Sequence, residues 1–194
     1  RVGLMTFGTR KKYKKDGYYE NFRGLNEAVV SEIEDRYSDE VINGSNDPEV
    51  LEELAWLRSD KALQIKKTVA KKQNISEDEL IWVNKNQKAE VIATKKTYHP
   101  QRKVLHFLVE QIAEETGKDK NEIMDMFFQA HFTGNLVDIA RLINDTFDDE
   151  LTFRALGMMG GEIQDGRQML DYLKKKRMLV KKRYKHEENQ DKTI

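Results

Sequence analysis

The sequence contains no cysteine and only two prolines in 194 residues. Without cysteine the chain forms no disulfide, no thiolate nucleophile and no thiolate metal site, and this composition fits a reducing cytoplasm. Apolar runs are short, as in Met178-Leu179-Val180, so the sequence predicts neither a bilayer-spanning helix nor a signal peptide. We therefore expect a cytoplasmic protein with no membrane contact.

Motifs of catalytic and cofactor chemistry are also missing. The glycine-rich patterns of phosphate-binding and dinucleotide-binding loops do not occur, and neither does the Gly-x-Ser-x-Gly turn of hydrolases. His99, His106, His131 and His186 have no three- or four-residue spacing that would make a helical metal pair. We expect no catalytic residues, no metal and no cofactor, and therefore a non-enzymatic protein.

The apolar fraction is low, at 38% of residues, compared with about 45 to 50% in an average domain. It is enough for a core made of thin helical layers, in one large domain or two small ones. The fold class that we predict is mainly α, a multi-helix domain. An extended or hairpin N-terminal arm precedes the helices, and a short β-hairpin is expected near 79–93.

Apolar residues that recur every three or four positions locate the helices. They predict helices over 25–42, 47–72, 100–116, 119–131, 136–143, 149–156 and 164–183, and the helix over 47–72 should be the longest of the first half. Gly117 is expected to close one helix, and Asp119 to cap the next. Around 79–93 two interpretations compete: a hairpin with its turn at 84–87, or a helix that begins with the capping pair Ser76 and Glu79.

These elements suggest a division of the chain. A basic arm with an acidic helical region would occupy residues 1–73. A second helical region with a basic C-terminal helix would occupy 74–186, and a disordered tail 187–194. A single domain over the whole chain is the alternative.

The two signs of charge are equal in number, 34 of each, but they are sorted along the chain. Residues 1–24 have a net charge of +5, and residues 25–60 a net charge of −9. Five lysines occur without an acid between Lys61 and Lys72, and residues 119–171 have a net charge of −7. Residues 172–186 then contain eight bases and no acid. Since salt screens charges beyond about 8 to 10 Å, each block acts locally, and a total charge of zero does not exclude polyanion binding.

Two hypotheses follow from the sorted charges. In the first, the protein is a nucleic-acid-binding accessory protein, with DNA the expected ligand and a phage or plasmid the suggested setting. In the second, it is a structural or adaptor protein whose basic ends pair with acidic surfaces, in the same molecule, in another copy as a homo-oligomer, or in another protein. The candidate nucleic-acid-binding residues are Arg10, Lys11, Lys12, Lys14, Lys15, Lys95, Lys96, Lys174, Lys175, Arg177, Lys181, Lys182, Arg183 and Lys185.

One segment resembles a known family. A strand pattern over 90–96, a helix over 100–117 and a second helix over 119–131, with Leu108–Ile123 at the centre, resemble the ribbon-helix-helix DNA-binding proteins. The resemblance implies that two chains pair their strands into a ribbon in the major groove. Depending on the register of the strand, it places either Ala93 and Lys95 or Thr94 and Lys96 toward the bases, and residues 118–121 near a phosphate. An ordinary helical hairpin in a protein core is the alternative.

The acidic cluster Asp145, Asp148, Asp149 and Glu150 lacks the glycine and the ligand spacing of a calcium-binding loop. Negative charge is favourable at a helix N-terminus, where the backbone N–H groups point outward. We therefore expect these acids to cap a helix.

Overall fold

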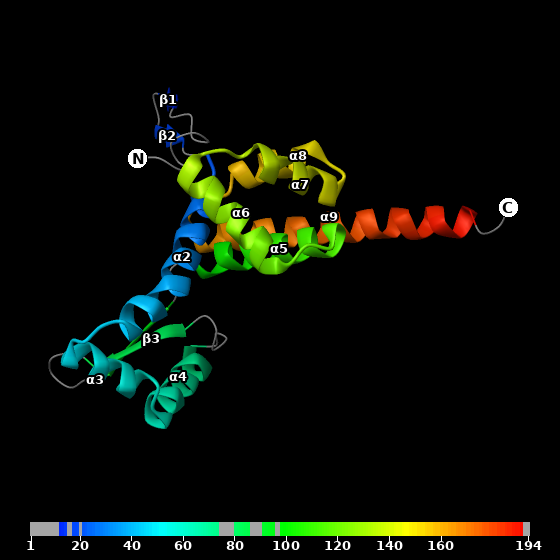
Figure 1. Cartoon of the computed structure of the whole chain (residues 1–194). Coiled ribbons are helices and arrows are strands. Elements are labelled where there is room, and N and C mark those ends of the chain that lie inside the picture. Colours follow the sequence, from blue (N-terminus) through cyan, green and yellow to red (C-terminus); the bar gives the residue numbers. More distant parts are fainter. Residues whose placement is uncertain are drawn as a thin grey trace. The chain divides into compact units, whose positions relative to one another are not determined.

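A computed structural model of the protein describes residues 12–14, 17–19, 21–73, 80–85, 91–95 and 98–191, with side chains described over 21–37, 44–53, 55–72 and 98–184 (Figure 1). Helices form most of this described chain, which confirms the predicted mainly-α class. The chain divides into two compact units. Unit 1 consists of Arg1–Glu32 and Pro100–Ile194, and unit 2 consists of Ile33–His99.

This division differs from the predicted boundary between residues 73 and 74. Helix α4 (Asp60–Gln73) packs against strand β3 (Leu80–Lys85), so the chain on both sides of that boundary belongs to unit 2. Unit 1 is discontinuous in sequence, because both ends of the chain contribute to it. The prediction rested on local patterns, whereas domain membership is decided by packing between distant segments.

The helix predicted over 47–72 is in fact two helices, α3 (Pro48–Leu57) and α4. Ser59 lies at the break, where its hydroxyl donates to the Trp56 carbonyl at 2.6 Å and accepts from the Ala62 N–H at 3.3 Å. Serine followed by Asp60 is a favourable helix start, because a side-chain oxygen and a negative charge both suit the free N–H groups. The longest helix in this half is α2 (Arg23–Asn43), so that prediction was wrong.

Strands β3 and β4 (Val91–Lys95) pair antiparallel in unit 2. The register joins Trp82 to Thr94 and Lys85 to Val91. Asn84 pairs with Ile92 and Lys85 with Val91, so the first two residues of the predicted turn at 84–87 lie within β3. The chain at 86–90, like Ser76 and Glu79 of the alternative helix start, lies outside the described residues.

The N-terminal segment contributes two short strands, β1 (Lys12–Lys14) and β2 (Gly17–Tyr19). They pair antiparallel, with Tyr13 opposite Tyr18. The rest of the predicted arm, at residues 1–11, 15, 16 and 20, lies outside the described residues.

In unit 1 the first part of α2 is followed, after unit 2, by α5 (His99–Thr116), α6 (Lys120–Thr133), α7 (Val137–Phe147), α8 (Glu150–Gly157) and α9 (Ile163–Asp191). The predicted helix boundaries around α6 are confirmed. Gly117 has a φ of +71°, and Asp119 accepts from the Asn121 N–H at 2.7 Å. Gly134 ends α6 with a φ of +74°. The prediction that the chain is disordered from residue 187 is wrong as far as Asp191, because α9 continues to that residue.

The core of unit 1 is formed by one apolar face of each of its helices. Its largest fully buried side chains are Leu25, Leu105, Leu108, Ile112, Ile123, Phe127, Ile139, Ile143, Phe147 and Leu156. At the start of α2, Gly24 donates its N–H to the Met159 carbonyl at 2.9 Å. A Cβ at Gly24 would lie 2.3 Å from the Gly160 carbonyl oxygen, so this close approach of two backbones requires glycine.

A charged cluster joins α2 to α5 inside unit 1. Glu32 Oε1 accepts from Arg102 Nε at 2.7 Å and lies 2.7 Å from His106 Nε2, while Arg102 Nη2 is 2.6 Å from the same oxygen. Burial alone would raise the pKa of Glu32. The hydrogen bond and charge of His106, and then the charge and hydrogen bond of Arg102, outweigh burial, so the pKa is lowered from 4.5. Glu32 is therefore held as a carboxylate.

Replacing Glu32 by Gln should destabilise unit 1 at neutral pH by about 2 kcal/mol, because the neutral amide cannot form an ion pair with Arg102 and accepts a weaker hydrogen bond. The pKa of Glu32 is lower in the folded state, so its contribution to stability is full above pH 4.5, the unfolded value, and is lost as pH falls through the folded pKa. Urea unfolding at pH 7 and pH 3 should show a smaller difference between wild type and E32Q at pH 3. An equal difference at both values would contradict this account.

Candidate nucleic-acid interface

The predicted binding residues fall into three groups in the structure. Arg10, Lys11, Lys15 and Lys96 lie outside the described residues. Lys12 and Lys14 lie in β1 and Lys95 in β4, with their side chains not described. The remaining bases lie on α9, and all of their side chains except that of Lys185 are described. The geometry of the candidate site therefore comes from α9.

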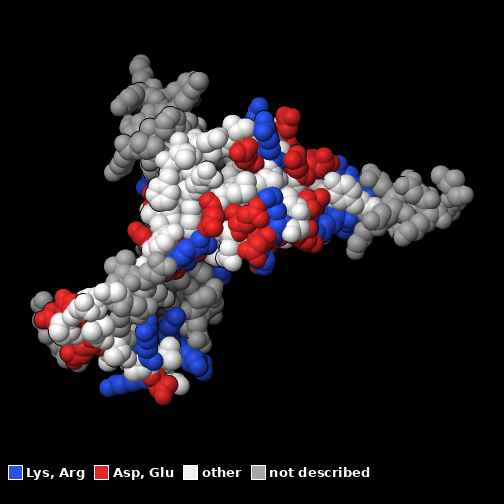
Figure 2. All heavy atoms as spheres, viewed as in Figure 1, with Lys and Arg blue, Asp and Glu red and all other residues white. Residues whose placement is uncertain are grey.

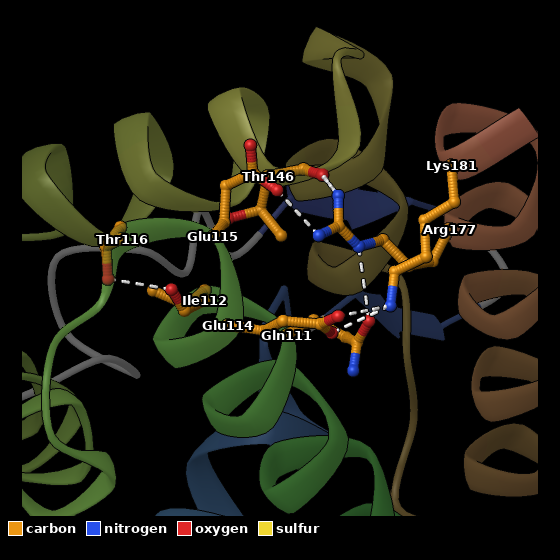
Figure 3. Close-up of polar contacts among 8 residues, drawn as sticks. All are labelled: Gln111, Ile112, Glu114, Glu115, Thr116, Thr146, Arg177 and Lys181. Carbon is orange, nitrogen blue, oxygen red and sulfur yellow. Dashed lines mark hydrogen bonds and ion pairs between the residues drawn. The ribbon is translucent and has the colours of Figure 1, made fainter. Parts of the chain in front are cut away.

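Arg177 was predicted to bind nucleic acid, and the structure corrects this, because the side chain faces the core of unit 1. Its side chain is only 6% exposed. Its guanidinium donates to the Thr146 carbonyl at 2.7 Å, to Gln111 Oε1 at 3.1 Å and to Glu115 Oε2 at 2.6 Å (Figure 3). A phosphate could contact this guanidinium only if these hydrogen bonds were broken. Arg177 therefore joins α9 to α5 and α7, and we withdraw it from the candidate binding residues.

Three more bases of α9 are paired with carboxylates of the same unit. Lys181 Nζ donates to both carboxylate oxygens of Glu114, at 2.7 and 2.8 Å, and Figure 3 shows this pair beside Arg177. Lys176 pairs with Asp149, and Arg183 Nη1 lies 2.8 Å from Asp148 Oδ2.

The neighbouring lysines lower the pKa values of two of the paired carboxylates. The hydrogen bond from Lys181 lowers the pKa of Glu114, and the hydrogen bond from Lys176 lowers that of Asp149. The predicted capping role of the acidic cluster is confirmed at Asp149, whose carboxylate accepts from the Leu151 N–H at 2.8 Å at the start of α8. Asp148 and Asp149 also pair with bases of α9, so part of the acidic block and part of the C-terminal basic block pair within unit 1.

Among the described side chains of α9, three lysines face outward. Lys174, Lys175 and Lys182 are exposed and have no ion pair within the part of the chain that the structure describes. Met178 and Leu179 lie between them and are about half exposed. Positions 174, 178 and 182 are four residues apart, so they follow one line along the helix. This outward face of Lys174, Lys175 and Lys182 is called the α9 lysine face below.

A shallow groove of about 480 Å³ adjoins this face. Phe107 and Gln111 of α5 line one side, and the α9 side is lined by Lys174, Arg177, Met178, Lys181 and Lys182. Its walls therefore combine an aromatic ring and a thioether with lysine ammonium groups. Such a groove can hold a chain that presents both apolar and acidic side chains.

The phosphate position implied by the family resemblance is occupied by internal contacts. Asp119 already accepts from the Asn121 N–H, Lys118 pairs with Glu122, and Lys120 Nζ lies 3.2 Å from Glu110 Oε1. In addition, β4 pairs with β3 of the same chain. These contacts do not require the family's two-chain ribbon, and the resemblance stays a prediction.

The sequence reasoning left α4 out of the candidate site. Lys61, Lys67, Lys71 and Lys72 are exposed on α4, and Lys66 is half-buried. The signal was present as an acid-free run between Lys61 and Lys72.

Comparisons with protein-family models, curated proteins and solved structures find no match to the chain. Over the described ranges, no group of three or more His, Asp or Glu side chains is placed to hold a metal ion. No helix in the same ranges is long and apolar enough to cross a membrane. Function is therefore inferred from the charged surfaces alone.

Proposed function

We propose that the protein is a nucleic-acid-binding accessory protein and that the α9 lysine face contacts the phosphate backbone. The observation that supports this proposal is that the described bases of α9 form two groups, one paired with carboxylates and one exposed. Lys176, Arg177, Lys181 and Arg183 are used in internal ion pairs, whereas Lys174, Lys175 and Lys182 are left toward solvent. The buried contacts of Arg177 hold α9 against α5 and α7, and the three outward lysines are available to a partner.

The dimensions of this face suit a phosphate backbone. Lys174 and Lys182 are eight residues apart, which is about 12 Å along a helix. One strand of duplex DNA presents a phosphate about every 3.4 Å of helix axis, so the face spans about three phosphates. Lysine contacts of this kind bind without reading sequence, because phosphates carry no base identity. The N-terminal bases, from Arg10 to Lys15, are proposed to add to the same non-specific binding.

Replacing Lys174, Lys175 and Lys182 together by Gln should weaken binding to duplex DNA and flatten its salt dependence. Each phosphate-bound lysine adds about 0.9 to the slope of log K against log salt, so three contacts account for about 2.7. The loss should be similar for unrelated sequences. Fluorescence anisotropy of a labelled duplex and a labelled single strand, titrated at several salt concentrations, measures both the affinity and the slope.

The matched control is R141Q/R154Q/R167Q, which also removes three positive charges from exposed positions of unit 1. These arginines lie in the acidic block 119–171, so their loss should change the slope little. Undetectable binding of either probe by the wild-type protein at low salt would refute the proposal.

The groove between α5 and α9 supports a second candidate function, as an adaptor that docks an acidic segment of a protein partner. Phe107 and Met178 would contact the apolar side of that segment, and Lys174 and Lys182 its carboxylates. In this case M178A/L179A should reduce partner binding strongly, because buried apolar area contributes more to affinity than charges at the rim. DNA binding by M178A/L179A at wild-type strength would favour the first function.

A further inference from the structure

Helix α4 of unit 2 has an unusual distribution of charge. Its sequence between Asp60 and Gln73 contains five lysines and no further acid. None of these lysines has an ion pair within the described residues. Figure 2 shows Lys and Arg gathered over the α4 part of unit 2, whereas the visible face of unit 1 mixes both signs. The lysines of α4 therefore differ from those of α9, of which Lys176 and Lys181 are paired within unit 1.

One side of α4 is explained by packing. Ala62 and Ala70 are buried, and the helix packs against α3 and β3. The opposite side carries Lys67 and Lys71, with Lys61 and Lys72 toward its edge, and the polar residues between them are Gln64 and Thr68, both exposed. We call this set of four exposed lysines the α4 lysine face.

Helix stability explains this face only in part. Lys71 and Lys72 lie in the last turn, where positive charge suits the helix dipole. Lys61 lies in the first turn, where positive charge is unfavourable. Lys67 and Lys71 are four residues apart, and like charges at that spacing destabilise a helix by about 0.2 to 0.5 kcal/mol. A polyanion bound along this face would offset both the unfavourable position of Lys61 and the repulsion between Lys67 and Lys71.

We propose that the α4 lysine face is a second nucleic-acid contact, independent of α9, that binds the phosphate backbone of duplex DNA. This inference rests on the proposed function, that the chain binds nucleic acid, and adds a site in the other unit. Charge complementarity identifies the occupant. The face combines ammonium groups with amide and hydroxyl groups, which are the side-chain types that contact phosphate and sugar.

The length of the face matches several phosphates. Lys61 and Lys71 are ten residues apart, or about 15 Å along the helix. Over that distance one DNA strand presents about four phosphates. The four exposed lysines can therefore each approach a separate phosphate.

The test uses the full chain and a labelled DNA duplex. Variant K61Q/K67Q/K71Q should flatten the slope of log K against log salt by about 2 to 3, because each lost phosphate contact removes about 0.9. When salt is raised from 50 to 200 mM, the DNA affinity of a variant whose slope is flatter by 2.7 falls about 40-fold less than that of the wild type. Variant K61R/K67R/K71R should retain the wild-type slope, since arginine keeps the charge. Circular dichroism verifies that both variants keep their helices.

The outcomes separate this inference from the proposed function. A loss with K61Q/K67Q/K71Q, together with little change in R141Q/R154Q/R167Q, supports the α4 site. If the α4 variant binds like wild type while K174Q/K175Q/K182Q is weakened, the inference is overturned and the proposed function stands. An equal loss in the α4 variant and the arginine control also overturns it, because net charge alone then explains binding. If the wild-type protein binds no DNA at low salt, both proposals fail.

Discussion

Replacing Arg177 by Met should lower the free energy of unfolding by about 3 kcal/mol, the lower end of the range for removing one partner of a buried ion pair. Methionine keeps an apolar stem of similar shape, so the change removes the guanidinium rather than the packing. The Thr146 carbonyl, Gln111 Oε1 and Glu115 Oε2 each lose a donor. Glu115 is 35% exposed, and water can partly replace the lost donor there, which places the effect at the low end.

Urea unfolding followed by circular dichroism measures this change. Lys175→Met, on the exposed side of the same helix, is the control and should alter stability by less than about 0.5 kcal/mol. Arg177→Lys should fall between the two, since it keeps the charge but cannot make the same set of planar hydrogen bonds. If R177M unfolds at the wild-type urea concentration, the contacts drawn in Figure 3 do not hold α9 to α5 and α7.

The same variant distinguishes a structural base from a binding base. Arg177 is buried, and its guanidinium is already hydrogen-bonded within unit 1, so R177M should leave the salt slope of DNA binding at its wild-type value when measured on folded protein. A flatter slope would return Arg177 to the binding residues and would mean that α9 rearranges on DNA.

The sequence predicted those parts of the fold that depend on local signals. Gly117 closes α5 in the left-handed conformation, and Asp119 caps α6 with its own carboxylate. Asp149 does the same for α8. Such signals act within about four residues, so they can be recognised without knowledge of the tertiary structure. The break at Ser59 was also local, but the continuing apolar pattern on both sides concealed it.

The roles of the α9 bases could not be predicted in the same way. Arg177 lies 62 positions from Glu115 and Lys181 lies 67 from Glu114. The separate basic and acidic blocks of the sequence indicated that ion pairs between blocks could form. They did not show which bases face the core. Burial of α9 against α5 and α7 decides that, and this packing joins segments that are distant in sequence. Lys174, Lys175 and Lys182 remain candidates because they lie on the other side of the helix.

Replacing Leu108 by Ala should lower the stability of unit 1 by about 2 to 5 kcal/mol, because the side chain has no solvent exposure and its removal leaves a cavity. Leu108 lies in the middle of α5, with Leu105 and Ile112 on the same buried face. The surrounding helices hold these neighbours in place, so the cavity cannot close fully. Leu179→Ala is the matched control, since Leu179 is 55% exposed and should cost less than about 0.5 kcal/mol.

The position of the tryptophans allows the effect to be assigned to one unit. The chain has two, Trp56 and Trp82, and both lie in unit 2. Circular dichroism reports helices of both units, whereas tryptophan fluorescence reports unit 2 alone. L108A should therefore shift the unfolding transition seen by circular dichroism to lower urea while the fluorescence transition moves less. An unchanged circular dichroism transition would mean that Leu108 is not a core residue, and equal shifts in both signals would mean that the two units unfold as one.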